Sequence, residues 1–129
     1  MTNTVDFRML DLTEGEKYTL VWYDNLTGIT TANIKLVDFY VDRYAQYENS
    51  LFLNVIIGRR RSIQELIFTP NESILIVKGT YKINFNSLYT VEEHDGVTHK
   101  YSKVLSMSSD WIKAAREQVK DQDVICYQY

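Results

Sequence analysis

Two histidines and their acidic neighbours are the first residues whose types could support chemistry. His94 and His99 lie five positions apart around an Asp95-Gly96 turn, and Glu92 and Glu93 precede them. Imidazoles that meet across a hairpin tip could, with carboxylates, hold a divalent metal ion such as zinc. Hairpin tips are commonly just polar, however, and metal sites usually draw ligands from distant segments as well. We therefore expect no metal, and a metal-dependent enzyme around His94 and His99 is our third hypothesis for function.

Cys126 is the only cysteine, so no intramolecular disulfide can form. A nucleophilic thiolate needs a nearby base, whereas the neighbours Ile125 and Tyr127 predict a buried, unreactive thiol. The motifs GxSxG, HExxH and CxxC are absent, as is a glycine-rich phosphate loop. Adjacent carboxylates such as Glu92-Glu93 would point to opposite faces of a strand. The sequence therefore predicts a protein that is not an enzyme and that carries no cofactor.

Three consecutive arginines, Arg59, Arg60 and Arg61, form the most distinctive cluster in the chain. They stand between two apolar runs, 51–57 and 63–68, in a protein of net charge −3. Three adjacent guanidinium groups must face either an anionic partner or water, and a turn between two strands would display them outward. We expect them to make charge-assisted contacts with a carboxylate-rich or phosphate-bearing surface.

Further basic residues, Lys78 and Lys82, lie on predicted strands and complete the set of candidate partner-binding residues. Small β-barrels often bind single-stranded nucleic acid by stacking bases on aromatic rings beside cations. Tyr81, Tyr89 and Tyr101 could form such a platform. However, Tyr81 shares its strand phase with Ile83, which points it toward the core.

Composition places the whole chain, residues 1–129, in one globular domain. It is 45% hydrophobic and 13% aromatic, with ten tyrosines, enough for a packed interior. The negative net charge argues against indiscriminate binding to nucleic acid. No apolar stretch reaches the ~20 residues of a membrane helix, and the N-terminus lacks the pattern of a secretory signal. We expect a cytoplasmic protein without a membrane partner, in which open strand edges could form a homo-oligomer.

The elements that must position these residues are mostly short strands. The patterns predict strands at about 17–23, 29–41, 50–57, 62–69, 73–77, 81–86, up to 91 and 97–105. Residues 123–129 are predicted to form a terminal strand or an ordered tail. Within 29–41 the apolar phase changes from Ile34 and Leu36 to Val37, Phe39 and Val41, which predicts a bulge or sharp bend. The strand at 50–57 is apolar on both faces, so we expect it to be covered on both sides.

One amphipathic helix is predicted at about 109–120. Ser108 or Ser109 can cap it, and Trp111, Ile112, Ala115 and Val119 form a stripe along one face. This helix resembles the closing helix of pleckstrin-homology-like domains, although a predicted strand follows it here. A resemblance of this kind concerns fold and implies no function.

Together these patterns predict a β-rich α+β fold. We expect a small β-barrel or a two-layer antiparallel sandwich of about seven or eight strands, closed by the C-terminal helix. The predicted function is a non-catalytic accessory or regulatory module that binds another macromolecule, above all a protein. The alternative is a single-stranded nucleic-acid binder. The Asn-, Tyr- and Ile-rich composition resembles that of small proteins from bacteriophages and mobile elements.

Overall fold

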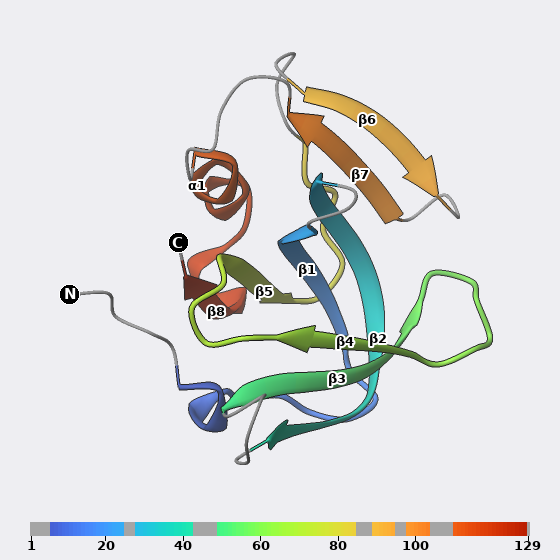
Figure 1. The fold of residues 1–129 in the computed structure, drawn as a ribbon, viewed down its shortest axis with the longest axis vertical. Helices are drawn as coiled ribbons and strands as arrows, with labels where there is room; N and C mark the ends of the chain where they lie inside the picture. Colours follow the sequence, from blue (N-terminus) through green and yellow to red (C-terminus); the bar gives the residue numbers. More distant parts are fainter. Residues whose placement is uncertain are drawn as a thin grey trace.

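The computed structural model describes residues 6–24, 28–42, 49–84, 89–94, 98–103 and 110–128. The strands are β1 (Lys17–Asp24), β2 (Gly28–Asp42), β3 (Ser50–Ile57), β4 (Gln64–Phe68), β5 (Ile74–Lys78), β6 (Tyr89–His94), β7 (Thr98–Lys103) and β8 (Val124–Gln128). A short 3-10 helix, η1 (Phe7–Met9), precedes them, and α1 (Asp110–Glu117) and η3 (Asp121–Asp123) precede β8. Figure 1 shows these elements along the chain. The β-rich α+β class is confirmed.

The strands form one antiparallel sheet in the order β4-β3-β2-β1-β5-β8. The β6–β7 hairpin joins it sideways, because β7 pairs with the first part of β2. It projects from the upper end of the molecule in Figure 1. Within the described residues, β4 and β8 end the strand path and no pairing joins them. The expected barrel or two-layer sandwich is therefore not confirmed: the described strands form one curled sheet, in which the two end strands do not pair with each other.

The long strand β2 changes its phase at a β-bulge. Its register with β3 shifts between Leu36 and Asp38, so that Val37 is the extra residue. Because of this insertion, Phe39 and Val41 pack against the same core as Ile34 and Leu36. The predicted bulge is confirmed, but β2 continues in the same sheet and does not cross to a second one.

The larger core lies on the concave face of the curled sheet. It combines side chains from six strands, including Leu20, Ile34, Leu53, Phe68, Ile76 and Cys126. Trp22 of β1 meets Phe68 of β4 edge to face, with ring centroids 5.7 Å apart. Phe7 of η1 is buried in the same core. This core, which we call the inner core, explains the curl, since it brings side chains of the two end strands, β4 and β8, into one cluster.

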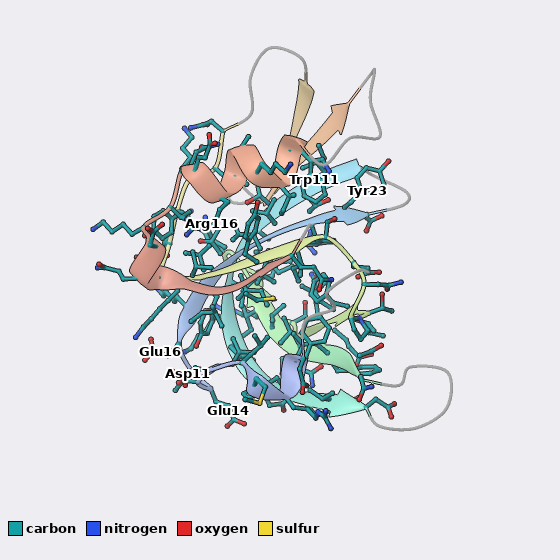
Figure 2. All side chains as sticks on the ribbon, turned by 90° about the vertical axis from the view of Figure 1, so that its left-hand side faces the viewer. Asp11, Glu14, Glu16, Tyr23, Trp111 and Arg116 are labelled. Carbon is teal, nitrogen blue, oxygen red and sulfur yellow. The ribbon has the colours of Figure 1, made fainter. Side chains whose placement is uncertain are left out.

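A second, smaller core lies between the other sheet face and α1. Trp111, Ile112, Ala115 and Val119 are buried against Val21, Ile29, Leu75, Val77 and Ile83. The predicted apolar stripe of the helix is therefore confirmed, although α1 ends at Glu117. Trp111 lies beside the Tyr23 ring, 6.3 Å between centroids, as Figure 2 shows. The predicted caps Ser108 and Ser109 lie outside the described residues.

Alternation predicts a strand at 81–86 after β5, of which residues 85 and 86 lie outside the described residues. Residues 81–84 make no strand pairing, although Ile83 is buried and Lys82 exposed as expected. Side chains take the place of a neighbouring strand. The Tyr81 N–H donates to Thr19 Oγ1 at 2.9 Å, and the Asn84 N–H donates to Gln118 Oε1 at 2.8 Å. The side chains of residues 81–84 therefore alternate between more buried and exposed, as in a strand, although this segment has no strand partner in the described residues.

Candidate partner-binding surface

The arginine cluster lies in the turn between β3 and β4. Gly58 opens this turn at φ 60°, a left-handed conformation that glycine adopts without strain. Its N–H donates to the Asn33 carbonyl at 3.3 Å, and the Arg60 N–H donates to the Ile57 carbonyl at 3.2 Å. Arg59, Arg60 and Arg61 are all exposed. The sequence prediction of an exposed turn between two strands is thus met.

A pocket of about 230 Å³ lies at the base of this turn. Its lining includes Lys17 from β1, Lys35 from β2 and Arg59 from the turn, together with Asn33, Ile56 and Thr80. Its lining contains three cationic residues and no carboxylate. Among the described residues, no ion pair neutralises Lys17, Lys35 or Arg59. We call this feature the cationic pocket.

Lys17 and Lys35 face each other directly across two strands. Their Cα atoms are register partners in the β1–β2 pair, so both side chains leave the same face of the sheet. Like charges at directly opposed positions destabilise a sheet. Both lysines are exposed, so we expect a repulsion at this point that water partly screens.

The other two predicted binding residues lie apart from the pocket lining. Lys78 is exposed and is the register partner of Tyr18, whose side chain enters the inner core. Because successive residues of a strand point to opposite faces, Lys78 leaves the opposite face of the sheet from Lys17. Lys82 is exposed in the segment after β5. Only Arg59 of the five predicted residues belongs to the pocket lining.

An apolar patch occupies the convex face of β2, β3 and β4. Tyr40, Phe52 and Ile67 are consecutive cross-strand partners, and we call them the β2–β4 patch. The Tyr40 and Phe52 rings are stacked, with centroids 4.7 Å apart. Tyr40 is 49% exposed and Ile67 39%. Phe52, between them, is buried, whereas Asn54 and Ile56 on the same face are partly open to water. The expectation that 50–57 is covered on both sides therefore holds for part of this strand only.

Carboxylates border the β2–β4 patch. Asp38, Asn54 and Glu65 form the neighbouring cross-strand row, and Asn54 Nδ2 donates to Asp38 Oδ1 at 2.5 Å. Partial desolvation, together with the negative charges of Glu65, Asp42 and Asp38, raises the pKa of Tyr40. The Tyr40 phenol thus stays protonated and can donate a hydrogen bond.

The patch and the pocket share one sheet face. Lys35 is the register partner of Ile56 in the β2–β3 pair, and Tyr40 is the partner of Phe52 farther along. Ile56 and Phe52 are four residues apart on β3, so they point to the same face. Ile63, which follows the arginine turn, is 56% exposed. Cationic, apolar and acidic groups therefore follow one another along a single surface.

The residues considered for catalysis and metal binding lie in two places: Cys126 on β8, and His94 and His99 in the β6–β7 hairpin, where the structure describes the backbone pairing alone. Burial raises the pKa of the Cys126 thiol to about 11, and Cys126 is buried in the inner core as predicted. His94 is in register with Thr98, and His99 with Glu93, so the histidines are not opposite each other. In the part of the chain that the structure describes, no three His, Cys, Asp or Glu residues are grouped to hold a metal ion.

Tyr81 makes contacts that stabilise the fold, as its strand phase predicts. It packs against the second core, and its hydroxyl donates to Asp123 Oδ2. That hydrogen bond, followed by burial, raises the pKa of Tyr81. Tyr89 and Tyr101 lie in the β6–β7 hairpin, where the structure describes the backbone pairing alone.

Sequence reasoning missed Lys17, Lys35, Tyr40 and Ile67. The turn at 24–28 could have predicted that Lys17 and Lys35 lie opposite each other. Asp24 pairs with Gly28 in the hairpin, and counting back along both strands places Lys17 opposite Lys35. For Tyr40 the signal was the bulge, which sets the tyrosine on the convex face while Phe39 and Val41 turn inward.

Comparison with known proteins finds no matching family model, no matching curated protein and no matching solved structure. Among the described residues, no helix has the length and apolar character needed to cross a membrane.

Proposed function

We propose that the protein is a non-catalytic accessory or regulatory module that binds another protein through the convex face of β2–β4 and the adjacent arginine turn. One observation supports this most: exposed Tyr40, Ile63 and Ile67 lie on or beside the same sheet face as Arg59. Protein interfaces combine an aromatic or aliphatic centre with arginines and a polar rim. The described surface has these three components.

The carboxylates around Tyr40 favour a protein over a nucleic acid as the partner. Asp38, Asp42 and Glu65 act electrostatically on the Tyr40 phenol, and they would repel the phosphates of a nucleic acid lying across the patch. A protein partner can present cations to these carboxylates and anions to the arginines. Single-stranded nucleic acid remains the alternative, because the arginine turn alone would suit it.

The test is a parallel pull-down from the lysate of the native host with four baits: wild type, an Arg59/Arg60/Arg61→Ala triple variant, Ile67→Glu and Met9→Glu. Met9 is a matched control because it is 80% exposed in η1, outside the proposed surface. Each lysate is divided and one half is treated with nuclease. We expect a protein band that survives nuclease, is retained by Met9→Glu and is lost with both the triple variant and Ile67→Glu.

Other outcomes decide against the proposal. Bands that vanish with nuclease and depend on the arginines alone would replace it with the nucleic-acid alternative. Identical recovery by all four baits would show that neither the patch nor the turn binds a partner. If the recovered protein is a second copy of this chain, the surface is a self-association interface.

A further inference from the structure

The cationic pocket has the chemistry of an oxyanion site. Lys17, Lys35 and Arg59 reach it from three separate segments, β1, β2 and the β3–β4 turn, and Asn33 adds an amide. Ammonium and guanidinium groups donate strong charge-assisted hydrogen bonds to carboxylates and phosphates. None of these three cations has a carboxylate partner within the described part of the chain.

Charge and shape favour a phosphoryl group over a carboxylate. A phosphoryl group carries close to two negative charges near neutral pH and three acceptor oxygens pointing in different directions. Three cations arranged around one cavity match that distribution, whereas a carboxylate offers two oxygens in a plane. The volume of about 230 Å³ is several times the ~30 Å³ that one water molecule occupies in the liquid. It therefore leaves room for atoms that carry the group.

We propose that the pocket formed by Lys17, Lys35, Arg59 and Asn33 is a binding site for a phosphoryl group. The bound anion offsets the repulsion between the opposed lysines of β1 and β2, so binding and sheet stability are coupled. The site goes beyond the proposed protein contact, because a small anion can occupy it without any partner. In the full assembly, the group would arrive either free or on a phosphorylated side chain of a partner protein.

The test measures binding of inorganic phosphate by isothermal titration calorimetry at constant ionic strength, with acetate as the planar comparator. We expect wild type to bind phosphate more tightly than acetate. Lys17→Gln and Lys35→Gln should each weaken phosphate binding about ten-fold, the loss expected for one charge-assisted hydrogen bond. Lys78→Gln is the matched control, since Lys78 is near Lys17 in the sheet but leaves its opposite face.

A charge reversal at the same position separates loss of the site from loss of the fold. In Lys35→Glu the new carboxylate faces Lys17 across the strands, so we expect a higher melting temperature together with no phosphate binding. Equal weakening by Lys78→Gln would show a diffuse charge effect and overturn the proposal. So would phosphate binding by Lys35→Glu at the wild-type level, or wild-type binding of phosphate no tighter than of acetate.

Two more arms identify the source of the group and keep the two proposals apart. A short peptide containing phosphoserine, compared with the same peptide containing serine, is titrated alongside inorganic phosphate. Tighter binding of the phosphopeptide assigns the group to a protein, and tighter binding of inorganic phosphate assigns it to a free anion. Ile67→Glu should leave phosphate binding unchanged, so failure of the β2–β4 patch and failure of the pocket are separate results.

Discussion

Cys126 shows how burial controls the chemistry of a single side chain. The thiol lies in the inner core on β8, and desolvation raises its pKa from an ordinary value of 9.0 to about 11. The thiolate is the reactive form of cysteine. At neutral pH the folded protein therefore presents almost no nucleophilic sulfur, which agrees with a structural role.

The raised pKa of Cys126 predicts a pH dependence of stability. Below pH 9 the thiol is protonated in both the folded and the unfolded chain, so it causes no change. Between pH 9 and about 11 the unfolded chain loses this proton first, and the free energy of unfolding should fall by roughly 2–3 kcal/mol. Urea denaturation of wild type and Cys126→Ala across this pH range measures the free energy of unfolding and checks whether the fall depends on the thiol. An equally steep fall in the variant would contradict the assignment to Cys126.

The segment of residues 81–84 shows how one element can replace another's hydrogen bonds. Gln118, just after α1, accepts from the Asn84 N–H and donates back to the Asn84 carbonyl. It also donates to the Ala114 carbonyl at 3.1 Å, which holds its side chain against the end of the helix. One side chain thus supplies both ladder bonds that a neighbouring strand would make.

Removing this side chain should loosen the segment without unfolding the helix. In Gln118→Ala we expect the Asn84 amide to exchange about ten-fold faster, with a loss of roughly 1 kcal/mol in the free energy of unfolding. Hydrogen exchange measured by mass spectrometry or NMR checks this. Glu117→Ala, at the adjacent exposed position, is the control and should leave Asn84 unchanged. Similar exchange in both variants would show that Gln118 does not hold the segment.

These elements also mark the limit of prediction from sequence. Alternation and turn residues predicted β1 to β7, with the bulge in β2, and the helix, because local patterns determine them, and they left residues 123–129 as a strand or an ordered tail. Residues 81–84 have the same alternation, but strand formation needs a free neighbouring edge, which a local pattern does not report. The arginine turn was predictable for the same local reason. Its association with Lys17 and Lys35 required strand register, which depends on how the whole sheet is assembled.

Across the whole molecule, charge and packing are unevenly distributed. The acidic residues Asp11, Glu14 and Glu16 lie together on one side of the molecule, below α1 in Figure 2, whereas the cationic pocket begins at the next residue, Lys17. The sheet encloses the inner core although, among the described residues, β4 and β8 do not pair with each other. A side chain spans the gap: Gln128 Nε2 of β8 donates to the Pro70 carbonyl and, at 2.7 Å, to the Glu72 carbonyl, both in the β4–β5 connection.

Gln128 should therefore help to close the open side of the sheet. It is buried, so Gln128→Ala leaves two carbonyls without this donor, and we expect a loss of about 2 kcal/mol in the free energy of unfolding. Limited proteolysis should show faster cleavage in residues 69–73. Gln122→Ala, on the exposed surface of η3, should be neutral in both measurements. Wild-type stability in Gln128→Ala would mean that packing alone holds the two edges together.

The edge of β2 that carries two different strands has a consequence for how this architecture can diversify. Residues 29–32 pair with β7, and from Ile34 onward the same edge pairs with β3. In the described sheet, β7 joins the strand path through β2 alone and β6 joins through β7. The hairpin is thus attached to the sheet through the pairing of four β2 residues with β7. A longer, shorter or exchanged hairpin would leave the registers of β1, β3 and β5 unchanged. Variation can accumulate there while the rest of the sheet keeps its form.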